Sequence, residues 1–417
     1  MKSKQIFEGV KVADFTWVGV GPQVGRELAE HGATVVHVES HRRPCTLRVG
    51  APYKDGIPGI DRSAFGMAFN TQKYGMSLDL TKPKGLEVAR KLIMWADLMG
   101  EAFTPGTMKR LGLDYESVRE FKPDIIYFST SQQGQGGPWE KFGGYGSFAA
   151  AMGGYSHITG WPDRVPLSIF NNYTDFISPW YLTIAVVLAL EHRRRTGEGT
   201  YIDQGQVEAG VNFIGPALID YAVNGRTAGR MGNRDPYMAP HSAYPCSGDD
   251  RWVDIAVGSD KEWQAFCKAI GEPDWTHEPK FATFQGRKEN EDELDCLVAE
   301  WTKDYLDREV MLQMQSHGVA AGVAQTSPDL FQDPQLKHRQ HFRVLNHTVI
   351  GSHAYNAPAY ILSKTPNDIH RAAPCLGEHN DFVYKEILGY SDEEVTQFLL
   401  DNVITTEHDV PDILRKK

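Results

Sequence analysis

Short apolar strands alternate with amphipathic helices through the first 130 residues of this chain, and this alternation limits the possible folds more than any other feature. The expected strands and helices occupy residues 10–15, 24–31, 34–38, 84–95, 115–121 and 124–129 in turn. Such alternation predicts parallel strands joined by crossover helices. We therefore expect an α/β protein with an open, mostly parallel, Rossmann-like sheet.

The character of the sequence changes after about residue 225. Residues 224–245 are rich in Gly, Arg, Asn and Pro, and they precede an expected strand at 252–257 and helices within 261–270 and 287–317. This order predicts a second, smaller α+β domain. The expected division is a large α/β domain at 1–200, a linker at 201–224, a small domain at 225–329, and a return to the large domain at 330–417.

Composition narrows the function classes. The chain has 417 residues and a formal net charge of −11, which argues against nucleic acid as the main partner. We expect no membrane span, because no apolar run reaches about 18 residues. A cytoplasmic protein is expected, because no apolar signal region follows Met1. The five scattered cysteines and the histidine spacings predict neither disulfides nor a metal site.

Glycines at positions 19, 21 and 25 lie between an expected strand and helix, and Glu39 ends the next strand. The arrangement is similar to a dinucleotide fingerprint. Its spacing is G-x-G-x-x-x-G, however, and Pro22 removes an amide from the turn. An NAD site and a turn built from structural glycines are the two interpretations, and the spacing favours the turn.

Asp175 lies just before a helix expected from Pro179 to about Arg195, with Ser178 as the N-cap. An aspartate at such a place is commonly a cap or a surface group. Aromatic residues surround it in sequence, at Phe170, Tyr173, Phe176 and Trp180. A carboxylate that is ionised but partly shielded from water can act as a nucleophile, so both interpretations stay open on these residues alone.

A series of short phrases carries a family resemblance. They are Asp14-Phe-Thr with Gly21-Pro22, Leu28-Ala-Glu-His-Gly-Ala33, Ser77-Leu-Asp-Leu80, Ala96-Asp97, Pro105-Gly106, Arg110-Leu-Gly-Leu113, Gly134-Gln-Gly-Gly-Pro138, Arg195-Thr-Gly-Glu-Gly199, Gly232-Asn233 and Pro374-Cys-Leu-Gly-Glu-His379. In this order and spacing the sequence resembles the family III coenzyme A transferases over nearly its whole length.

The resemblance implies a reaction. Asp175 occupies the place of the family's aspartate nucleophile, which lies before the long helix that ends in Arg-Thr-Gly. Coenzyme A would pass from an acyl-CoA donor to a free carboxylic acid through an aspartyl anhydride and an aspartyl-CoA thioester. Acyl-CoA is then a substrate, and no cofactor is bound permanently.

The resemblance also implies contacts. Coenzyme A would lie against Val18, Gly19, Leu78, Asp79, Thr81, Ala102, Phe103, Thr104 and Arg110. Ser40 stands where a basic residue is frequent in the family, so Arg42, Arg43 or Arg48 would hold the phosphates instead. Tyr145, Tyr173, Phe176 and Trp180 are the expected substrate contacts. Their rings predict a bulky or aromatic acid, such as a substituted dicarboxylic acid.

Alternatives and partners follow from the same resemblance. A racemase branch uses a histidine where this chain has Tyr145, and tyrosine is a poorer base at neutral pH. Family members form entwined dimers, so a homodimer or a heterodimer with a homologous chain is expected. A noncatalytic partner subunit is the third possibility, and the presence of Asp175 disfavours it.

Overall fold

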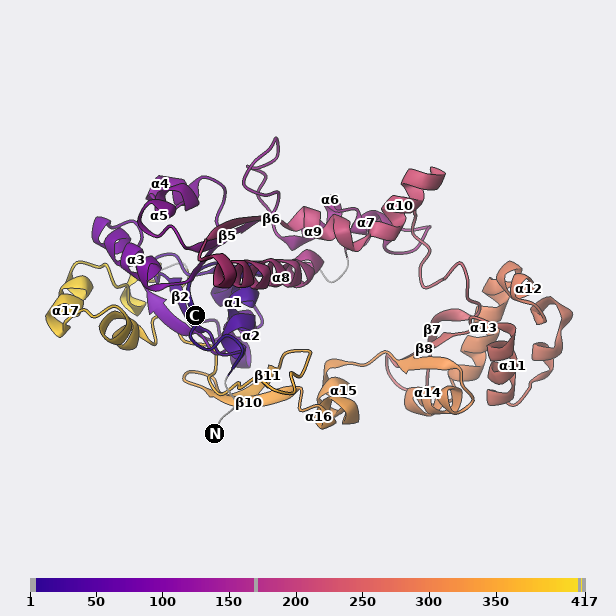
Figure 1. The fold of residues 1–417 in the computed structure, drawn as a ribbon. Helices are drawn as coiled ribbons and strands as arrows, with labels where there is room; N and C mark the ends of the chain where they lie inside the picture. Colours follow the sequence, from indigo (N-terminus) through magenta and orange to yellow (C-terminus); the bar gives the residue numbers. More distant parts are fainter. Residues whose placement is uncertain (1–4, 169–171, 412–413, 415–417) are drawn as a thin grey trace. The chain divides into compact units, whose positions relative to one another are not determined.

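The computed structural model describes residues 5–168, 172–411 and 414, and it forms two compact units (Figure 1). The larger unit comprises Met1–Tyr155, Ser168–Gly225 and Lys337–Lys417, and the smaller comprises Ser156–Leu167 and Arg226–Leu336. The chain therefore enters the smaller unit twice, because the short segment Ser156–Leu167 belongs to it as well.

A six-stranded parallel sheet is the centre of the larger unit. Its strands are β1 (Lys11–Phe15), β2 (Thr34–Glu39), β3 (Tyr74–Ser77), β4 (Leu98–Glu101), β5 (Ile126–Ser131) and β6 (Thr200–Gly205). They are ordered β3-β2-β1-β4-β5-β6, and Val12 pairs with Val35 on one side and Leu98 on the other. The strand order reverses between β1 and β4, as in doubly wound folds.

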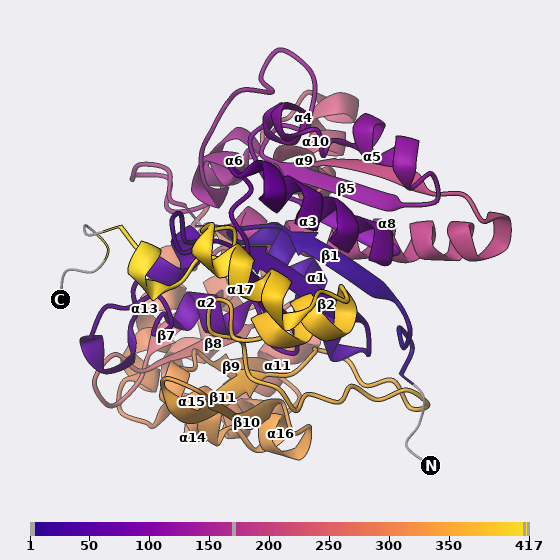
Figure 2. The same ribbon diagram turned by 90° about the vertical axis from the view of Figure 1, so that its left-hand side faces the viewer.

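Helices cover both faces of this sheet, because successive strand residues point to opposite sides. Val12 packs with α1 (Val20–Glu30) and α8 (Tyr173–Thr196). Ala13 packs on the other face with α3 (Pro83–Trp95) and α17 (Asp392–Leu400), as Figure 2 shows for the helices. Strands buried on both faces account for the nearly continuous apolar runs in the sequence.

Shorter elements complete the larger unit. The helical ones are η1 (Thr46–Val49), η2 (Lys54–Gly56), α2 (Ala64–Ala68), α4 (Thr107–Leu111), α5 (Tyr115–Phe121), α6 (Gly146–Met152), α7 (Tyr155–Ile158), which crosses the boundary, α9 (Gln206–Phe213), α10 (Gly215–Asn224), η5 (Phe382–Ile387) and η6 (Glu407–Asp409). Strands β10 (Phe342–His347) and β11 (Gly351–Asn356) form an antiparallel hairpin.

The smaller unit has its own apolar core. Strands β7 (His241–Pro245), β8 (Trp252–Ala256) and β9 (Ala320–Val323) form an antiparallel sheet. The helical elements are α11 (Asp260–Ala269), η3 (Asp274–His277), η4 (Pro279–Phe281), α12 (Phe284–Glu289), α13 (Glu291–Thr302), α14 (Asp307–Ser316), α15 (Ser327–Gln332) and the boundary helix α16 (Pro334–His338). Val253 and Ile255 point from one face of β8 into the core with α11, α13 and α14.

These observations confirm the α/β class and the mostly parallel sheet. Two local predictions are wrong. The expected linker at 201–224 instead contributes the edge strand β6 and helices α9 and α10. Helix α8 begins at Tyr173, not near Pro179, so Ser178 lies inside the helix and is not its N-cap.

Candidate active site

The carboxyl ends of β1, β4 and β5 meet where the strand order reverses, and two cavities lie there. Ligands of open α/β sheets bind in the crevice at this switch point. The narrow cavity, of about 150 Å³, is lined by residues 102–105 after β4 and by Gln132 after β5, among others. The wide cavity, of about 340 Å³, is lined mainly by η1, α2 and the start of α8. Val18, Gly19, Tyr145 and Asp175 line both, so these residues form the shared wall.

Asp175 lies in the first turn of α8, and the residue is 7% exposed. Pro179, four residues later, has no N–H to donate to the Asp175 carbonyl. The Gln23 side-chain amide takes this place, with Nε2 donating to the Asp175 carbonyl at 2.7 Å and to the Gly19 carbonyl at 3.0 Å. Gln23 therefore joins the loop after β1 to the turn of α8 that carries Asp175.

Two glycines lie against the Asp175 carboxyl group. A Cβ atom at Gly146 would lie 2.7 Å from Asp175 Cγ, and one at Gly19 would lie 3.0 Å from it. Both distances are shorter than packed carbon atoms tolerate. Neither position can therefore carry a larger side chain unless Asp175 moves.

Two donors face the same carboxyl group, namely the Gly146 backbone N–H and the Gln206 side chain. The Thr174 hydroxyl lies 2.9 Å from the Gly146 carbonyl and 3.5 Å from Gln206 Oε1, which leaves the Gln206 amide nitrogen for Asp175. Burial raises the pKa of Asp175 to about 6, and the two hydrogen bonds oppose that rise. The carboxyl group is therefore mostly ionised at neutral pH although it is shielded from water.

Val18 in the shared wall has a strained backbone. Its φ is +65°, a left-handed conformation that is unusual for a β-branched residue. Its N–H donates to Cys45 Sγ at 3.2 Å. Strain of this kind is found where the surroundings fix a segment firmly, commonly at functional sites.

A cluster of buried polar residues fixes the start of the loop after β1 through hydrogen bonds. Asp14 Oδ2 accepts from Lys73 Nζ at 2.9 Å and contacts His37 Nδ1 at 3.0 Å, while Asp14 Oδ1 accepts from the Thr16 backbone N–H. A Cβ atom at Gly25 would lie 2.8 Å from Asp14 Oδ2. Gly25 thus allows close packing against this cluster, which agrees with the structural interpretation of the glycine motif.

Five of the expected coenzyme A contacts gather in the narrow cavity, namely Val18, Gly19, Ala102, Phe103 and Thr104. Thr104 also lines an outer cavity of about 520 Å³, together with Lys109, Arg110 and Lys141. Glu101, Asp114, Glu116 and Glu140 lie in the same outer cavity, so its charge is mixed. Arg110 thus lines a cavity that shares Thr104, Pro105 and Glu140 with the narrow cavity beside Asp175.

The remaining expected contacts line none of these three cavities. Leu78 is buried in the core. Asp79 Oδ1 accepts from Thr81 N and Oγ1, at 2.9 and 2.6 Å, and Asp79 Oδ2 lies 3.4 Å from Arg42 Nε. Asp79 therefore closes a local turn, and its negative charge is turned toward Arg42.

Arg48 was expected to bind a phosphate, and the structure contradicts this prediction. Its side chain is 3% exposed and forms ion pairs with Glu39 and Asp61, both at 2.6 Å. It also donates to the Pro374 carbonyl. This guanidinium is already neutralised inside the protein, so it is not available to a phosphate. Arg42 and Arg43 remain exposed.

Only some of the expected substrate contacts line the two cavities. Tyr145 lines both cavities, and Phe176 lines the wide one. Tyr173 instead packs on Tyr155 and Phe213, with ring centroids 5.4 and 5.7 Å apart. Trp180 is exposed on α8 and lines neither cavity. Phe170 lies outside the described residues.

Sequence reasoning missed four residues that complete the site. Phe65 on α2, Phe69 directly after α2 and Leu47 on η1 line the wide cavity, and Gln206 follows the edge strand β6. Recognition of β6 would have pointed to Gln206, because residues after the carboxyl ends of parallel strands gather at one edge. No comparable signal marks α2, whose place against Asp175 depends on tertiary packing.

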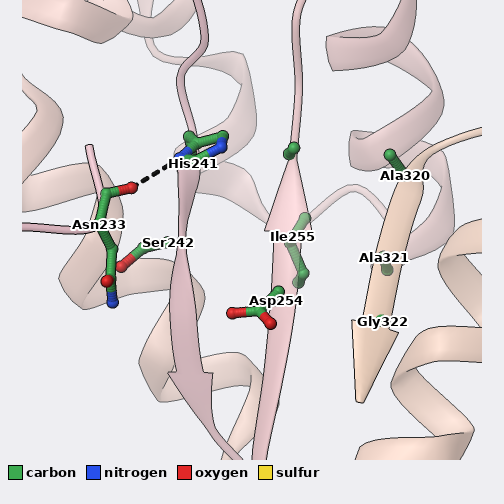
Figure 3. Close-up of a pocket in the computed structure, with 9 residues that line it drawn as sticks. Asn233, His241, Ser242, Asp254, Ile255, Ala320, Ala321 and Gly322 are labelled. Atoms are coloured by element: carbon green, nitrogen blue, oxygen red, sulfur yellow. Dashed lines mark hydrogen bonds between the residues drawn. The ribbon is translucent and has the colours of Figure 1, made fainter. Parts of the chain in front are cut away.

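The smaller unit holds a separate cavity of about 420 Å³ on its sheet, shown in Figure 3. Residues of β7, β8 and β9 line it together with Asn233, and His241 Nδ1 lies 2.6 Å from the Asn233 carbonyl oxygen. Asp254 is the carboxylate in its wall, and burial raises the pKa of that group. Among the described residues no cluster of His, Cys, Asp or Glu is arranged to hold a metal ion.

Fold and site together define an α/β protein with two cavities at a sheet switch point, which share a buried carboxylate. The chain belongs to CoA-transferase family III, whose family model matches residues 7–380. The expected family is thereby confirmed. Enzymes of this kind use CoA thioesters as substrates and transfer coenzyme A to carboxylic acids.

Individual relatives are similar along almost the whole chain. Succinyl-CoA–D-citramalate CoA-transferase of Chloroflexus aurantiacus is 30% identical over 95% of this chain and 98% of its own. Succinate–glutarate CoA-transferase of Agrobacterium fabrum is 30% identical over 92% and 96%. The crystal structure of a CaiB/BaiF family protein from Brucella suis has a TM-score of 0.85 and 29% identity, and the match covers 92% of this chain and 100% of that one.

Proposed function

We propose that Asp175 is the covalent nucleophile of a CoA-transferase whose acid substrates are bulky and apolar. The observation that carries this proposal is the position of the carboxyl group in the wall between two cavities. One cavity holds five of the contacts implied for coenzyme A, and the other is lined by aromatic rings. A carboxylate in this position can reach a thioester that lies across both.

The reaction proceeds in four balanced steps. The Asp175 carboxylate attacks the acyl carbon of the donor, which gives a mixed anhydride and expels the CoA thiolate. The thiolate attacks the Asp175 carbon of the anhydride and releases the donor acid. The acceptor carboxylate then attacks the aspartyl thioester, which gives a second anhydride and the thiolate again. Attack of the thiolate on the acceptor carbon forms the new acyl-CoA and restores Asp175.

The surroundings of Asp175 suit each step. Burial removes water that would hydrolyse the anhydride or the thioester. The Gly146 N–H and the Gln206 amide keep the carboxylate ionised, and the same donors would stabilise oxyanions that form on its carbon. Gly19 and Gly146 lie so close to the carboxyl group that a side chain at either position would displace it.

Coenzyme A is proposed to extend from Asp175 through the narrow cavity to the outer cavity. Thr104 lies where the two cavities join, and Lys109 and Arg110 supply exposed cations beyond it. A phosphate interacts favourably with such side chains. We therefore propose that Arg110 binds a phosphate group of coenzyme A.

A homodimer, or a heterodimer with a homologous chain, is the proposed assembly. Helix α8 alone among the described helices is long and apolar enough to cross a membrane, yet 39% of its most apolar window is buried in the protein. Trp180, Ile184, Val187 and Leu188 are exposed along one side of it, and Ile219 and Val223 are exposed on α10. Exposed apolar side chains in this number are typical of a protein interface. Light scattering tests the assembly, and an active monomer would refute it.

Trapping the intermediate tests the nucleophile. Wild-type protein given an acyl-CoA without acceptor should carry a thioester or anhydride on the peptide that contains Asp175. Hydroxylamine should convert it to a hydroxamate, which peptide mass spectrometry locates. An adduct on another acidic residue would refute the proposal.

A further inference from the structure

We propose that Gln23 is a positioning residue for the reacting carboxylate, and that its side-chain amide fixes the loop after β1 against the first turn of α8. The inference rests on the proposed function, since it takes Asp175 as the nucleophile. Gln23 is not among the described residues that line the narrow, wide and outer cavities. It therefore acts through the backbone of Gly19 and Asp175 and not through contact with the substrate.

The first turn of α8 lacks one of its own hydrogen bonds. In a regular α-helix the Asp175 carbonyl would accept from the N–H of the residue four places later, but that residue is Pro179, which has none. Asp175 is buried, and a buried carbonyl without a donor is unfavourable. Gln23 Nε2 supplies the donor at 2.7 Å. This part of the contact stabilises the helix.

The same nitrogen reaches a second carbonyl, and this gives the contact a role beyond helix stability. Gln23 Nε2 also donates to the Gly19 carbonyl at 3.0 Å. The amide nitrogen carries two hydrogens, so each carbonyl can accept one of them. Gly19 and Asp175 both line the narrow and the wide cavity. One side chain thus joins the two segments that form the shared wall.

The carboxyl group has little clearance on the side of this loop. A Cβ atom at Gly19 would lie 3.0 Å from Asp175 Cβ and Cγ and 3.2 Å from Oδ2. A small shift between the loop and α8 would therefore press Gly19 against the carboxyl group or open a gap between them. Displacement of a reacting group by about 1 Å can slow a reaction about 100-fold, so loss of the Gln23 contact should slow attack by Asp175.

The backbone that carries Gln23 is itself fixed. Gln23 lies in α1, and Val24 of the same helix is buried in one apolar core with Leu182 and Val186 of α8. This core packs the two helices together, and the amide joins their ends nearest to the cavities. All of these residues belong to the larger unit, so both hydrogen bonds of Gln23 are formed within that unit.

A double-variant cycle separates positioning from helix stability. Gln23→Met keeps a similar side-chain length and removes the donor. Pro179→Ala restores a backbone N–H that can donate to the Asp175 carbonyl but not to the Gly19 carbonyl. Two quantities are measured for the wild type, both single variants and the double variant. They are the urea midpoint of unfolding and the rate, per folded molecule, at which Asp175 acquires the hydroxylamine-sensitive adduct.

Three thioesters serve as probes, namely succinyl-CoA, acetyl-CoA and phenylacetyl-CoA. Each is supplied at saturating concentration without an acceptor acid, and the one that labels wild-type Asp175 fastest is used for the variants. Peptide mass spectrometry follows the hydroxamate over time.

Gln23→Met should lower the urea midpoint, and it should lower the rate of adduct formation by about 10–100-fold. In the Pro179→Ala background the same substitution should cost little stability, because the Asp175 carbonyl then has another donor. The rate should still fall by at least about tenfold, because nothing replaces the contact with Gly19. Recovery of the rate together with the midpoint in the double variant would overturn the inference, as would a wild-type rate in Gln23→Met.

Gln204 offers a matched control. Its Nε2 donates to the Ser178 carbonyl of α8 at 2.8 Å, and it is half-buried like Gln23. It is not among the described residues that line the three cavities. Gln204→Met should therefore lower the urea midpoint and leave the rate per folded molecule near the wild-type value. A loss of rate as large as that of Gln23→Met would overturn the inference.

The proposed function fails on a different result. Absence of any adduct on Asp175 in the wild-type protein would overturn that function, and the inference with it. An adduct on Asp175 that forms equally fast in the wild type and in Gln23→Met would overturn the inference alone, so the two failures are distinguishable.

Discussion

The two cavities that share Asp175 differ in what their walls are made of. The narrow cavity is formed largely by residues that follow strands of the central sheet, among them the aromatic residues Trp17 and Phe103. The wide cavity is formed by side chains of η1, α2 and α8, which lie outside the sheet. A constant ligand portion suits a wall fixed by the sheet, and a variable portion suits a wall built outside the sheet. One carboxylate therefore lies between the part of the site that suits the constant portion of the ligand and the part that suits the variable portion.

The largest effect should come from the residue that both cavities share. Asp175→Ala and Asp175→Asn should lower turnover by about 10⁴-fold or more, because neither side chain can form the anhydride. Circular dichroism and CoA binding serve as controls for folding. A helix cap would behave otherwise, since its loss costs only about 0.5–2 kcal/mol of stability. Near-normal turnover per folded molecule would show that Asp175 is not the nucleophile.

Single ring deletions should separate the two cavities. Phe65 is 38% exposed, so Phe65→Ala should fold, and it should lower kcat/KM for a bulky acid by about 10–100-fold through lost apolar contact. The KM for the CoA thioester of a small acid should stay near the wild-type value. Phe103→Ala in the narrow cavity should do the reverse. Equal effects of both variants on both substrates would show that the cavities do not divide the ligand in this way.

A third variant tests the basic side chains that line the outer cavity. Arg110→Ala should raise the KM for CoA thioesters by about tenfold, and the difference from wild type should shrink as salt is added. Steady-state kinetics at two ionic strengths measure this. Arg42→Ala is the matched control, since Arg42 is similarly exposed but lines none of the three cavities. A larger effect at Arg42 would move the phosphate site to the turn near Asp79.

The smallest effect concerns pH. The pKa of Asp175 lies near 6, so activity should fall as the pH drops through that value and the nucleophile is protonated. Gln206→Met removes a donor to the carboxylate, so the pKa of Asp175 should rise and the acid limb should move to higher pH. The pH profile of kcat/KM measures the shift. If the acid limb of this profile does not move, Gln206 does not donate to the Asp175 carboxylate.

Much of the fold was predictable because buried parallel strands have a simple pattern. Residues 115–121 were expected to be helical and form α5, and the strand expected at 10–15 forms β1 at Lys11–Phe15. Strand β6 was missed because it is an edge strand with several exposed residues, so it lacks a continuous apolar run. The start of α8 was misplaced because proline usually marks a first helical turn, whereas here Gln23 substitutes for the missing donor.

The site was predictable only in part. Asp175 was found through sequence phrases, whereas its partner Gln206 and the rings of Phe65 and Phe69 come from distant segments that carry no shared phrase. Arg48 was assigned to phosphate because a sequence shows its charge but not the carboxylates of Glu39 and Asp61 around it. Contacts that depend on tertiary packing cannot be read from spacing alone.

The glycines beside Asp175 have an evolutionary consequence. Because Gly19 and Gly146 have no room for a side chain, mutation there cannot tune the acid that is accepted without moving the reacting group. Five of the eleven residues that line the wide cavity, among them Leu47, Phe65 and Phe69, come from one segment outside the sheet and the reacting turn. A short stretch of about two dozen residues would thus hold much of the inheritable variation in substrate choice, while the chemistry stays constant.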